Sequence, residues 1–442
     1  MKSIVTLLAA LTFAVWLPAQ PEITSWILND GETGTFYNTD GSTYDSGEAA
    51  NVTQVQFSDN NVYVSCTGIP DYAIGPYPDG NPALPGAQDY LFQIPRFPQE
   101  ETGSNYEVGL GHIGILINGV PIYNASDAMV YNTYWEQNAI FNENDGFDCA
   151  KGHPSPNMQN INQSYYHHHQ NPTAFSVAQN PTSDICDMYP SDGLYTPNPN
   201  EHSPILGYAF DGFPIYGSFA FDNTDGTGGI VRMISGYQLR NISERTSLPD
   251  GTALDAQFWG PPINASNPLG KYMEDYEYVE SLGHLDEHNG RWCITPEYPE
   301  GTYAYFATID EDWNSAFPYF IGPTYYGVVE TDNFGSPGPG GSTTNVSIDE
   351  PVETWDGTLG VAGLNSENWM IFPNPALDIL RVQLPGEGAV TWKVMDARGG
   401  TSLQGTWRAA QNELNVESLP AGCYVLVVQT SHQVISKSWI KQ

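Results

Sequence analysis

Apolar and polar residues alternate over short stretches along most of the chain, which is the pattern of β-strands that bury one face. The clearest examples lie near the C-terminus, where turn dipeptides such as Pro385-Gly386 and Gly399-Gly400 separate them. These stretches are residues 379–384, 390–395 and 423–428. Their shortness and close spacing predict a small β-sandwich over residues 365–442.

A larger block, residues 20–330, contains one internal echo. The segment GILINGVPIYNAS (114–126) resembles GYAFDGFPIYGSF (207–219): each is an apolar run, an Asn-Gly or Asp-Gly pair and then Pro-Ile-Tyr. Such pairs favour the turns that close tight β-hairpins, so the sequence predicts two similar hairpins. The expected tips are Asn118-Gly119 and Asp211-Gly212, with Pro121 and Pro214 expected at edge positions of the sheet.

Helical patterns are scarce. Residues 126–138 are the best candidate for a helix, with Ser126 as its N-cap. The fold is therefore predicted to be mostly β, with a large β-rich domain followed by the small sandwich. Gly, Pro and Ser dominate residues 332–351, which predicts a linker over residues 331–364 between the two domains.

The N-terminus has the features of a secretory signal peptide over residues 1–19. Lys2 precedes an apolar run over residues 4–17, and Leu17-Pro18-Ala19 fits a cleavage site. The run is too short for a permanent membrane span, and no later stretch is long enough. We therefore expect a protein without a transmembrane segment that leaves the cytoplasm and is secreted or placed on the cell surface via the periplasm.

The charge balance narrows the partners. The 14 Lys+Arg residues stand against 51 Asp+Glu, which gives a net charge of −37. Such a surface repels nucleic acid and anionic membranes, so neither is expected as a partner. It would attract cations, including Ca²⁺, although a soluble acidic shell explains the same charge.

Five cysteines occur in this exported chain: Cys66, Cys149, Cys186, Cys293 and Cys423. An oxidising compartment permits disulfides, and we expect at least one among the first four. The predicted pair is Cys149 with Cys186, which bracket a run of histidines, and Cys423 is expected to remain unpaired in the small domain.

The histidine run is the strongest candidate for chemistry. In a strand over Tyr165–His169, alternation would place His167 and His169 on one face and His168 on the other. Two imidazoles on one face form half of a site for copper or zinc. His153 or His202 is expected to supply a further ligand, with His284, His288 or a carboxylate as alternatives, and a loop of solvated histidines remains the plain reading.

Other motifs carry less weight. His284-Leu-Asp-Glu-His288 matches the H-x-x-E-H pattern of inverted zinc proteases, but Gly283 and Asn289-Gly290 leave room for barely one helical turn. The acids at 310–312 could serve a glycosidase, and residues 222–226 could form a Ca²⁺-binding turn, but ordinary turns explain both. Four aromatic residues either line a pocket or fill the core, namely Tyr166, Tyr208, Phe213 and Tyr216. Asp211 is the acidic residue that most merits attention, although its position as the first residue of an Asp-Gly turn already explains it structurally.

The C-terminal segments FPNPALDIL, WKVMDARGG, LNVESLPAGCYVLVV and SKSWIKQ resemble the C-terminal sorting domain of type IX secretion substrates over residues 371–442. The resemblance implies export across a bacterial outer membrane, often with removal of the domain and attachment to the surface. The type IX secretion machinery would then be a partner, acting through residues 365–442.

The larger block resembles YHYH-domain proteins from about residue 100 to 330. The resemblance rests on DCAKGHPSP (148–156), YHHH (166–169), HSPILGYAFDGFPIYG (202–217), LDEHNGRWCITPEYPEGTYAYF (285–306) and FPYFIG (317–322). Three departures stand out. His168 replaces the second tyrosine of the signature, His288 stands where a cysteine is expected, and residues 303–306 look like a second signature without its histidines.

Two functions fit the sequence. In the first, a secreted YHYH-domain protein binds a transition metal through His167 and His169 with His153 or His202, for a structural, redox or hydrolytic role. In the second, the domain is a non-catalytic adhesion or carbohydrate-contact module that binds a glycan, a small molecule or Ca²⁺. Clustered histidines would favour the first, and dispersed histidines with an exposed aromatic strip would favour the second.

Overall fold

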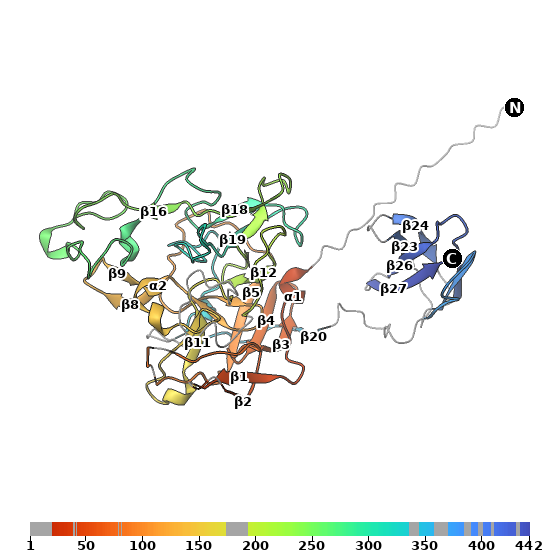
Figure 1. The fold of residues 1–442 in the computed structure, drawn as a ribbon, viewed down its shortest axis with the longest axis horizontal. Coiled ribbons are helices and arrows are strands. Elements are labelled where there is room, and N and C mark those ends of the chain that lie inside the picture. Colours follow the sequence, from red (N-terminus) through yellow and green to blue (C-terminus); the bar gives the residue numbers. More distant parts are fainter. Residues whose placement is uncertain are drawn as a thin grey trace. The chain divides into compact units, whose positions relative to one another are not determined.

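The computed structural model describes most of the chain after residue 19. The described residues are 20–173 apart from 39, 41, 78 and 81, then 193–335, 344–357, 370–383, 390–396, 401–407, 411–429 and 434–442. They are mostly β, as predicted, and the two α-helices, α1 (Pro21–Thr24) and α2 (Ala139–Asn142), are one turn each (Figure 1). The chain divides into two compact units between Thr354 and Trp355.

An eight-stranded sheet forms the centre of the larger unit. Its order is β10 (Gly152–Ser155), β11 (Tyr165–His168), β7 (Pro121–Tyr123), β6 (His112–Leu116), β12 (Ile205–Ala209), β13 (Pro214–Tyr216), β19 (Thr302–Phe306) and β18 (Gly290–Cys293). Read from either edge, the order is the same: an outer antiparallel pair, one parallel contact and an inner hairpin. The two halves meet where β6 pairs antiparallel with β12.

The two predicted hairpins are confirmed as β6–β7 and β12–β13. Gly119 and Gly212 lie at their tips with φ angles of 81° and 88°, a region that suits glycine. The expectation that Pro121 and Pro214 lie at the sheet edge is wrong. Each begins an interior strand, a position where the missing amide hydrogen is tolerated.

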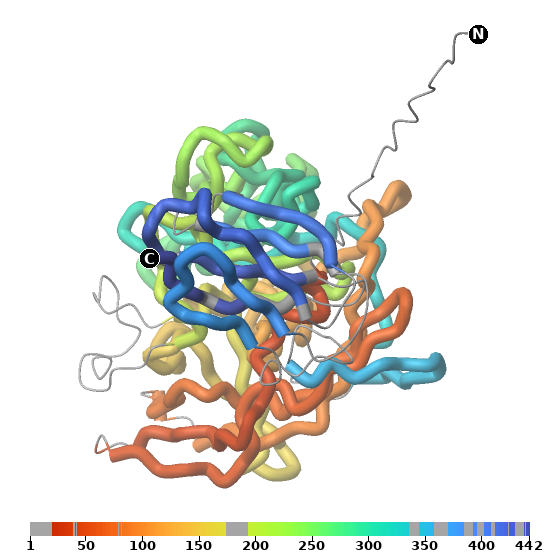
Figure 2. Tube along the Cα trace, turned by 90° about the vertical axis from the view of Figure 1, so that its right-hand side faces the viewer, coloured from red at the N-terminus to blue at the C-terminus, as the bar shows by residue number. Residues whose placement is uncertain are grey.

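Every residue of β6 and β12 is buried, so both faces of the sheet centre are covered. A second, four-stranded sheet in this unit has the order β20 (Glu353–Trp355), β3 (Val52–Phe57), β4 (Asn61–Cys66) and β5 (Tyr90–Pro95). Figure 2 shows β1 (Thr33–Tyr37) and β2 (Thr43–Ala49) as a hairpin at one end of the larger unit.

Part of the predicted linker packs on the larger unit. The side chain of Asn333, in η5 (Thr331–Asn333), is fully buried and exchanges two hydrogen bonds with the backbone of Gln93. Glu350 accepts hydrogen bonds from Asn61 and Tyr63, and β20 adds a strand to the sheet. Strand pairing and side-chain contacts therefore order residues that composition alone assigned to a linker.

The helix predicted over residues 126–138 is wrong. The segment forms the hairpin of β8 (Ser126–Val130) and β9 (Glu136–Asn138). The Asp127 and Asn132 side chains accept hydrogen bonds from the backbone amides two residues ahead, which favours turns over helix. A helix begins only afterwards, at α2, where the Asn138 side chain accepts from the amide of Ile140 as an N-cap.

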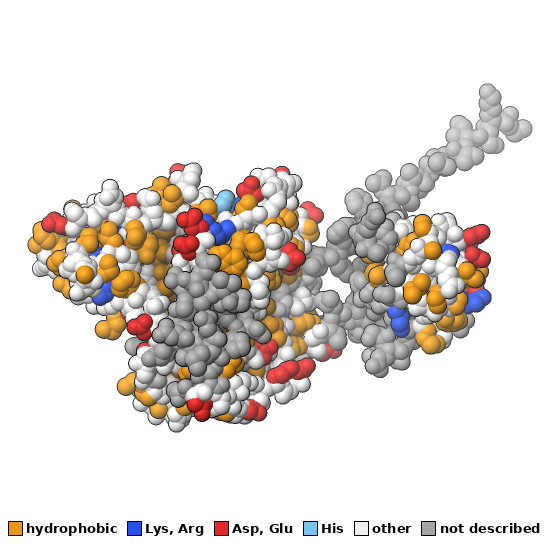
Figure 3. Space-filling view, in the orientation of Figure 1, with side chains coloured by type: hydrophobic (Ala, Val, Ile, Leu, Met, Phe, Trp, Pro, Cys, Tyr) orange, Lys and Arg blue, Asp and Glu red, His pale blue; other side chains and the backbone are white. Residues whose placement is uncertain are grey.

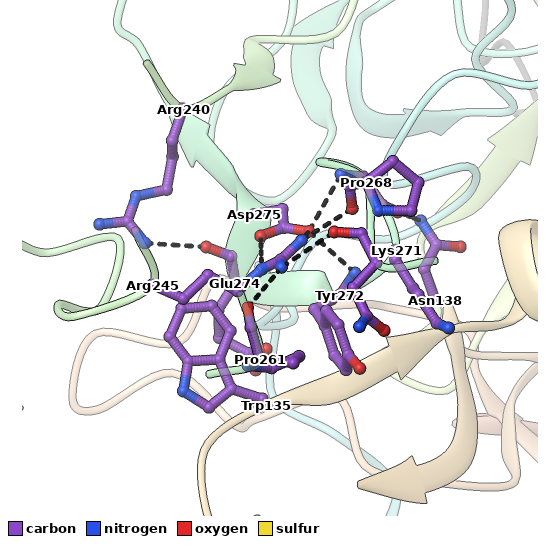
Figure 4. Close-up of polar contacts among 12 residues, drawn as sticks. Trp135, Asn138, Arg240, Arg245, Pro261, Pro268, Lys271, Tyr272, Glu274 and Asp275 are labelled. Atoms are coloured by element: carbon purple, nitrogen blue, oxygen red, sulfur yellow. Dashed lines mark hydrogen bonds and ion pairs between the residues drawn. The ribbon is translucent and has the colours of Figure 1, made fainter. Parts of the chain in front are cut away.

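A lobe around residues 233–285 is held by one buried ion pair (Figure 4). Arg245 donates to both oxygens of Asp275 at 2.7 and 2.8 Å, and neither side chain is exposed to solvent. The guanidinium also donates to the carbonyl oxygens of Pro261, Asn267 and Pro268. The strands of this lobe are β16 (Tyr237–Leu239) and β17 (Tyr276–Tyr278), which pair antiparallel, and the ion pair joins two residues that lie outside them.

The smaller unit confirms the predicted sandwich. One sheet has the order β21 (Met370–Phe372), β22 (Ile379–Gln383) and β25 (Gln411–Asn415). The other has the order β24 (Thr401–Trp407), β23 (Val390–Asp396), β26 (Gly422–Gln429) and β27 (Val434–Lys441). Residues from both sheets, such as Leu380, Val394 and Leu426, share one buried core.

Candidate metal centre

The histidine run lies at the end of an interior strand of the larger sheet. His167 is on β11 and His169 follows its last residue, and the two imidazoles approach on one side of the strand with their Nε2 atoms 3.0 Å apart. His168 points the other way, where its Nε2 lies 2.8 Å from the hydroxyl of Tyr72. The alternation of an extended strand thus separates His168 from its two neighbours.

His153 joins the pair from the adjacent edge strand. In the antiparallel register of β10 and β11, His153 lies directly opposite His167. One ring nitrogen of each of His153, His167 and His169 lies within 4.8 Å of the others, and all three side chains are buried. The structure thus brings three of the four histidines proposed from the sequence into one cluster.

Backbone carbonyl groups fix which nitrogen of each ring carries a hydrogen. The Nδ1 atom of His167 lies 2.9 Å from the carbonyl oxygen of Tyr165, and that of His169 lies 2.5 Å from the carbonyl oxygen of Asn124. Because a carbonyl oxygen only accepts, both Nδ1 atoms must be the donors. In neutral rings the two Nε2 atoms then present lone pairs to each other, an arrangement that a cation between them stabilises.

Glu143, just after α2, extends this cluster and was not identified from the sequence. Its Oε2 atom lies 3.4 Å from Nε2 of His169 and 3.6 Å from Nε2 of His153. Both Oε2 of Glu143 and Nε2 of His153 are buried and have no hydrogen-bond partner among the described residues. Buried polar atoms seldom lack a partner, so both atoms are available to a group bound between them.

Burial controls the electrostatics of the cluster. It lowers the pKa of His169 to about 4 and, together with the neighbouring His153 and His169, lowers the pKa of His167 well below its usual value. Burial, followed by the charges of Asp127 and Asp79, raises the pKa of Glu143 to about 8. The site thus disfavours added protons on its imidazoles, which keeps their lone pairs available as ligands.

Aromatic rings hold the imidazoles in place. The Tyr123 ring stacks on His167 with centroids 3.8 Å apart, and Phe147 contacts His153 at 4.6 Å. With the carbonyl groups that orient His167 and His169, these contacts restrict the rotamers of all three histidines. A site that is already arranged loses less entropy when it takes up a ligand.

The opposite face of β11 is a hydrogen-bonded support. The hydroxyl of Tyr166 donates to Asp148 at 2.9 Å, and the amides of Gly75 and Gly152 donate to the same carboxylate. Burial raises the pKa of Asp148 to about 7, although these hydrogen bonds oppose the shift. The contacts fix the turn that leads into β10 and therefore the position of His153.

His202, the fourth histidine proposed from the sequence, lies outside the cluster. Its Nδ1 atom is 2.8 Å from the carbonyl oxygen of Ser203, and its ring contacts Tyr216, in the other half of the sheet, and Phe221, which lies outside that sheet. No local pattern in the sequence indicates which half of the sheet His202 would face.

The remaining motifs have structural roles. His284 and His288 lie in a turn-rich segment without a helix, where His284 accepts from the amide of Ile234 and His288 contacts Thr324. Asp310 accepts hydrogen bonds within its own turn, and Asp225 does the same in the proposed Ca²⁺ turn. The four aromatic residues considered for a pocket, Tyr166, Tyr208, Phe213 and Tyr216, are buried in the core.

The cysteines are partly described. Cys149 is disulfide-bonded, four residues before His153. Its predicted partner, Cys186, lies outside the described residues. Cys66 and Cys293 are buried free thiols, and burial raises the pKa of both.

Part of the cluster has the spacing of ligand atoms around a four-coordinate metal ion. Tetrahedral ligand atoms about 2.05 Å from an ion are roughly 3.3 Å apart. Three separations lie close to that value: 3.0 Å between the Nε2 atoms of His167 and His169, and 3.4 and 3.6 Å from Oε2 of Glu143 to Nε2 of His169 and His153. The ring nitrogens of the three histidines span up to 4.8 Å, so His153 would have to move closer to the other two to share a tetrahedral ion with them. Imidazole nitrogens with one carboxylate suit zinc and copper, whereas Ca²⁺ prefers a shell of oxygen ligands.

Comparisons with known proteins agree with both sequence resemblances. The YHYH protein family matches residues 91–318, about half of the chain, and the secretion system C-terminal sorting domain matches residues 370–442. No curated protein matches the chain. Among solved structures, PorZ, an essential bacterial surface component of the type-IX secretion system of Porphyromonas gingivalis, aligns at 11% identity with a TM-score of 0.17. The alignment covers 90% of this chain and 60% of PorZ, and so low a score carries no argument.

Proposed function

This chain belongs to the YHYH protein family and ends in a type IX sorting domain, and we propose that it is an exported metalloprotein that binds copper or zinc. The sorting domain marks it as a secreted or cell-surface protein. No helix among the described residues is long and apolar enough to cross a membrane. The proposed metal site lies in the larger unit, within the part that matches the family.

One observation carries the proposal: two Nδ1–H groups are committed to carbonyl oxygens, and their Nε2 lone pairs converge at 3.0 Å. Two buried lone pairs at that distance repel unless a cation lies between them. His153 and Glu143 supply further unpartnered donor atoms on the same side. An ion held by these four groups would satisfy every one of them.

The chain's own groups would set the properties of the ion. Three imidazoles and one carboxylate leave a net charge of about +1 on a bound divalent ion. The Glu143 side chain is 31% exposed, whereas those of His153 and His169 are 9% and 4% exposed, so Glu143 marks the side nearest to solvent. A ligand from solvent would therefore approach past Glu143, where it could exchange with the carboxylate.

Metal analysis of the purified mature protein tests the proposal. The chain is stripped with a chelator, dialysed, and titrated with zinc or copper(II) by calorimetry, and bound metal is counted by mass spectrometry. We expect one equivalent per chain with an affinity tighter than micromolar. Failure of both metals to bind stoichiometrically would refute the metal site.

A second candidate function rests on exposed aromatic residues of the β8–β9 hairpin and of the lobe beside it. Tyr131 and Trp259 are 54% and 45% exposed, and Asn132 joins their segments by donating to the carbonyl oxygen of Trp259. Such rings suit contact with a sugar, since a carbohydrate ring can stack on an aromatic face. Trp259→Ala should weaken binding to a glycan array if this surface recognises carbohydrate, and unchanged binding would remove this candidate.

A further inference from the structure

The strand register makes the two halves of the central sheet equivalent residue by residue. When the two hairpin sequences are aligned, Ile115 and Tyr208 occupy the same position, and they pair with each other at the centre of the sheet. The pairs on either side, Gly114 with Ala209 and Leu116 with Gly207, are related by the same symmetry. On one side β11 lies parallel to β7 with His168 opposite Ile122, and on the other β19 lies parallel to β13 with Tyr305 opposite Ile215. Since Ile122 and Ile215 are the central residues of the two Pro-Ile-Tyr motifs, Tyr305 occupies the place of His168.

The turns that precede β10 and β18 contain the same set of hydrogen bonds. Asp148 accepts from the amide of Gly152 and the hydroxyl of Tyr166. Asp286 accepts from the amide of Gly290 and the hydroxyl of Tyr303. In each glycine a Cβ atom would lie within 2.4 Å of that tyrosine hydroxyl, so both turns require glycine for the same reason.

Backbone geometry agrees. Lys151 and Asn289, which precede these glycines, have φ angles of 68° and 65°. Gly152 lies opposite His168, and Gly290 lies opposite Tyr305. The residues that follow these glycines, His153 and Arg291, therefore occupy equivalent positions. The three histidines of the metal centre therefore have known counterparts: Arg291 for His153, Ala304 for His167 and Phe306 for His169.

We propose that the β18–β19 half is the scaffold of a second transition-metal site, in which the guanidinium of Arg291 has replaced the ion as the buried positive charge. The inference rests on the proposed function for the identity of the ligands. Each of the three residues is compatible with this replacement. Arg291 carries a positive charge itself, Ala304 leaves room for its long side chain, and the Phe306 ring can contact a cation with its face.

The surroundings of Arg291 match this account. The residue is 8% exposed, and its guanidinium carbon lies 5.8 Å from the centre of the Phe306 ring. It donates to the carbonyl oxygens of Phe221 and Asp222, at the end of β14 (Phe219–Phe221). The Nε atom of Arg291 is buried without a hydrogen-bond partner among the described residues.

The second site also explains the position of His202. Its ring contacts Tyr216, the counterpart of the Tyr123 ring that stacks on His167 in the metal centre. Its Nε2 atom is buried and unpartnered among the described residues, as a ligand of a lost ion would be. Tyr216 thus contacts an imidazole, as Tyr123 does, but this imidazole comes from His202 because Ala304 stands in the place of His167.

Restoring the histidines tests the inference. In the full mature chain, the triple variant Arg291→His/Ala304→His/Phe306→His should bind two equivalents of Zn²⁺, against one for the wild type, as counted by calorimetry and mass spectrometry. Arg291→His alone is the control and should still bind one. Replacing zinc by Co²⁺ should double the visible absorption of tetrahedral cobalt in the triple variant.

The reciprocal variant His153→Arg/His167→Ala/His169→Phe guards against a folding failure. It should bind no metal and fold without it, so that a chelator lowers the unfolding temperature of the wild type only.

A folded triple variant that binds one equivalent, when the wild type also binds one, would overturn the inference but not the first metal centre. Failure of both variants to fold would also overturn it, because the two scaffolds would not be interchangeable. A wild type without metal would refute the proposed function, and a triple variant that then bound one equivalent would still support the inference.

Discussion

A few individual residues determine how the side chains of the histidine cluster are oriented. A carbonyl oxygen behind each of His167 and His169 turns Nε2 toward the centre, and Glu143 brings a carboxylate from a helix end to the same point. His168, between the two, faces Tyr72 and makes no contribution there. Neighbouring residues of identical type thus have different roles, because the strand sends them to different faces.

Single substitutions should separate these roles. His167→Ala or His169→Ala should weaken zinc or copper binding by at least about a hundredfold, since each ligand contributes roughly 3 kcal/mol of the affinity of a four-ligand site. His168→Ala should lower the free energy of unfolding but leave one equivalent of bound metal in the folded protein. Calorimetric titration measures all three, and an equal loss in all three variants would contradict strand-directed ligation.

The carboxylate has its own test. Glu143→Gln keeps the size of the side chain but removes its charge, so metal affinity should fall by about 10- to 100-fold while the stoichiometry stays at one. Asp145→Asn, an exposed acid two residues further along, is the matched control and should bind as the wild type does. Equal affinities of the two variants in calorimetry would exclude Glu143 as a ligand.

Asp211 should make stability depend on pH. It accepts hydrogen bonds from Tyr305 and the amides of Phe213 and Gly327, but burial outweighs them and raises its pKa from 3.8 to about 6. The folded state then holds its proton more tightly than the unfolded state. The stability due to this group should be complete below about pH 4 and should fall, by up to about 3 kcal/mol, as pH rises to 6. Urea unfolding at several pH values, compared with Asp211→Asn, would reveal the difference, and parallel pH curves for the two proteins would contradict it.

At the scale of elements, the sequence predicted what depends on local chemistry. Asn118-Gly119 and Asp211-Gly212 marked both hairpins because their turns need φ angles that glycine allows, and alternation placed His167 and His169 together. Glu143 was missed because α2 is a single turn without periodicity, in a chain with 51 acidic residues. Its position is set by long-range contacts: the amide of Asn138 donates to the carbonyl oxygen of Lys271, and Asn138 then caps α2.

The helix predicted over residues 126–138 failed for a related reason. Its apolar residues fit a helical period, but Met129 and Tyr131 are exposed, and the hairpin is fixed by its neighbours. The amide of Glu136 donates to Glu274, in the lobe that Arg245 and Asp275 hold together. No local pattern in the sequence encodes a contact across 138 residues.

That lobe supplies a prediction about stability. Arg245→Met should destabilise the larger unit by about 3–5 kcal/mol, because it leaves the Asp275 carboxylate buried without its partner. Arg245→Met/Asp275→Leu should recover part of this loss, since no charge then remains in the apolar site. Denaturant unfolding measures both, with Arg381→Met at the exposed ion pair with Glu413 as the control, expected to cost less than about 1 kcal/mol. Similar losses at the buried and the exposed pair would contradict the prediction.

The whole molecule combines a duplicated sheet with an export module. The two halves of the sheet keep the same register, turns and tyrosines, but among the described residues only the β10–β11 half brings three histidines together, so one scaffold carries different side chains in its two halves. Acidic side chains lie in small groups between apolar and uncharged ones on the face shown in Figure 3. The acidic groups visible on this face are thus dispersed, whereas His153, His167 and His169 are buried.

The division into two units leads to a prediction about export. The smaller unit has its own core, and the contacts of β20 and Glu350 with the larger unit lie before residue 358. Deleting residues 365–442 should therefore leave the larger unit folded and able to bind metal, but retained in the periplasm. Cell fractionation with immunoblotting measures the location, and the intact chain carrying His167→Ala is the control that should still leave the cell. Normal secretion of the truncated chain would show that another part directs export. Retention of the control would show that metal occupancy is required for it.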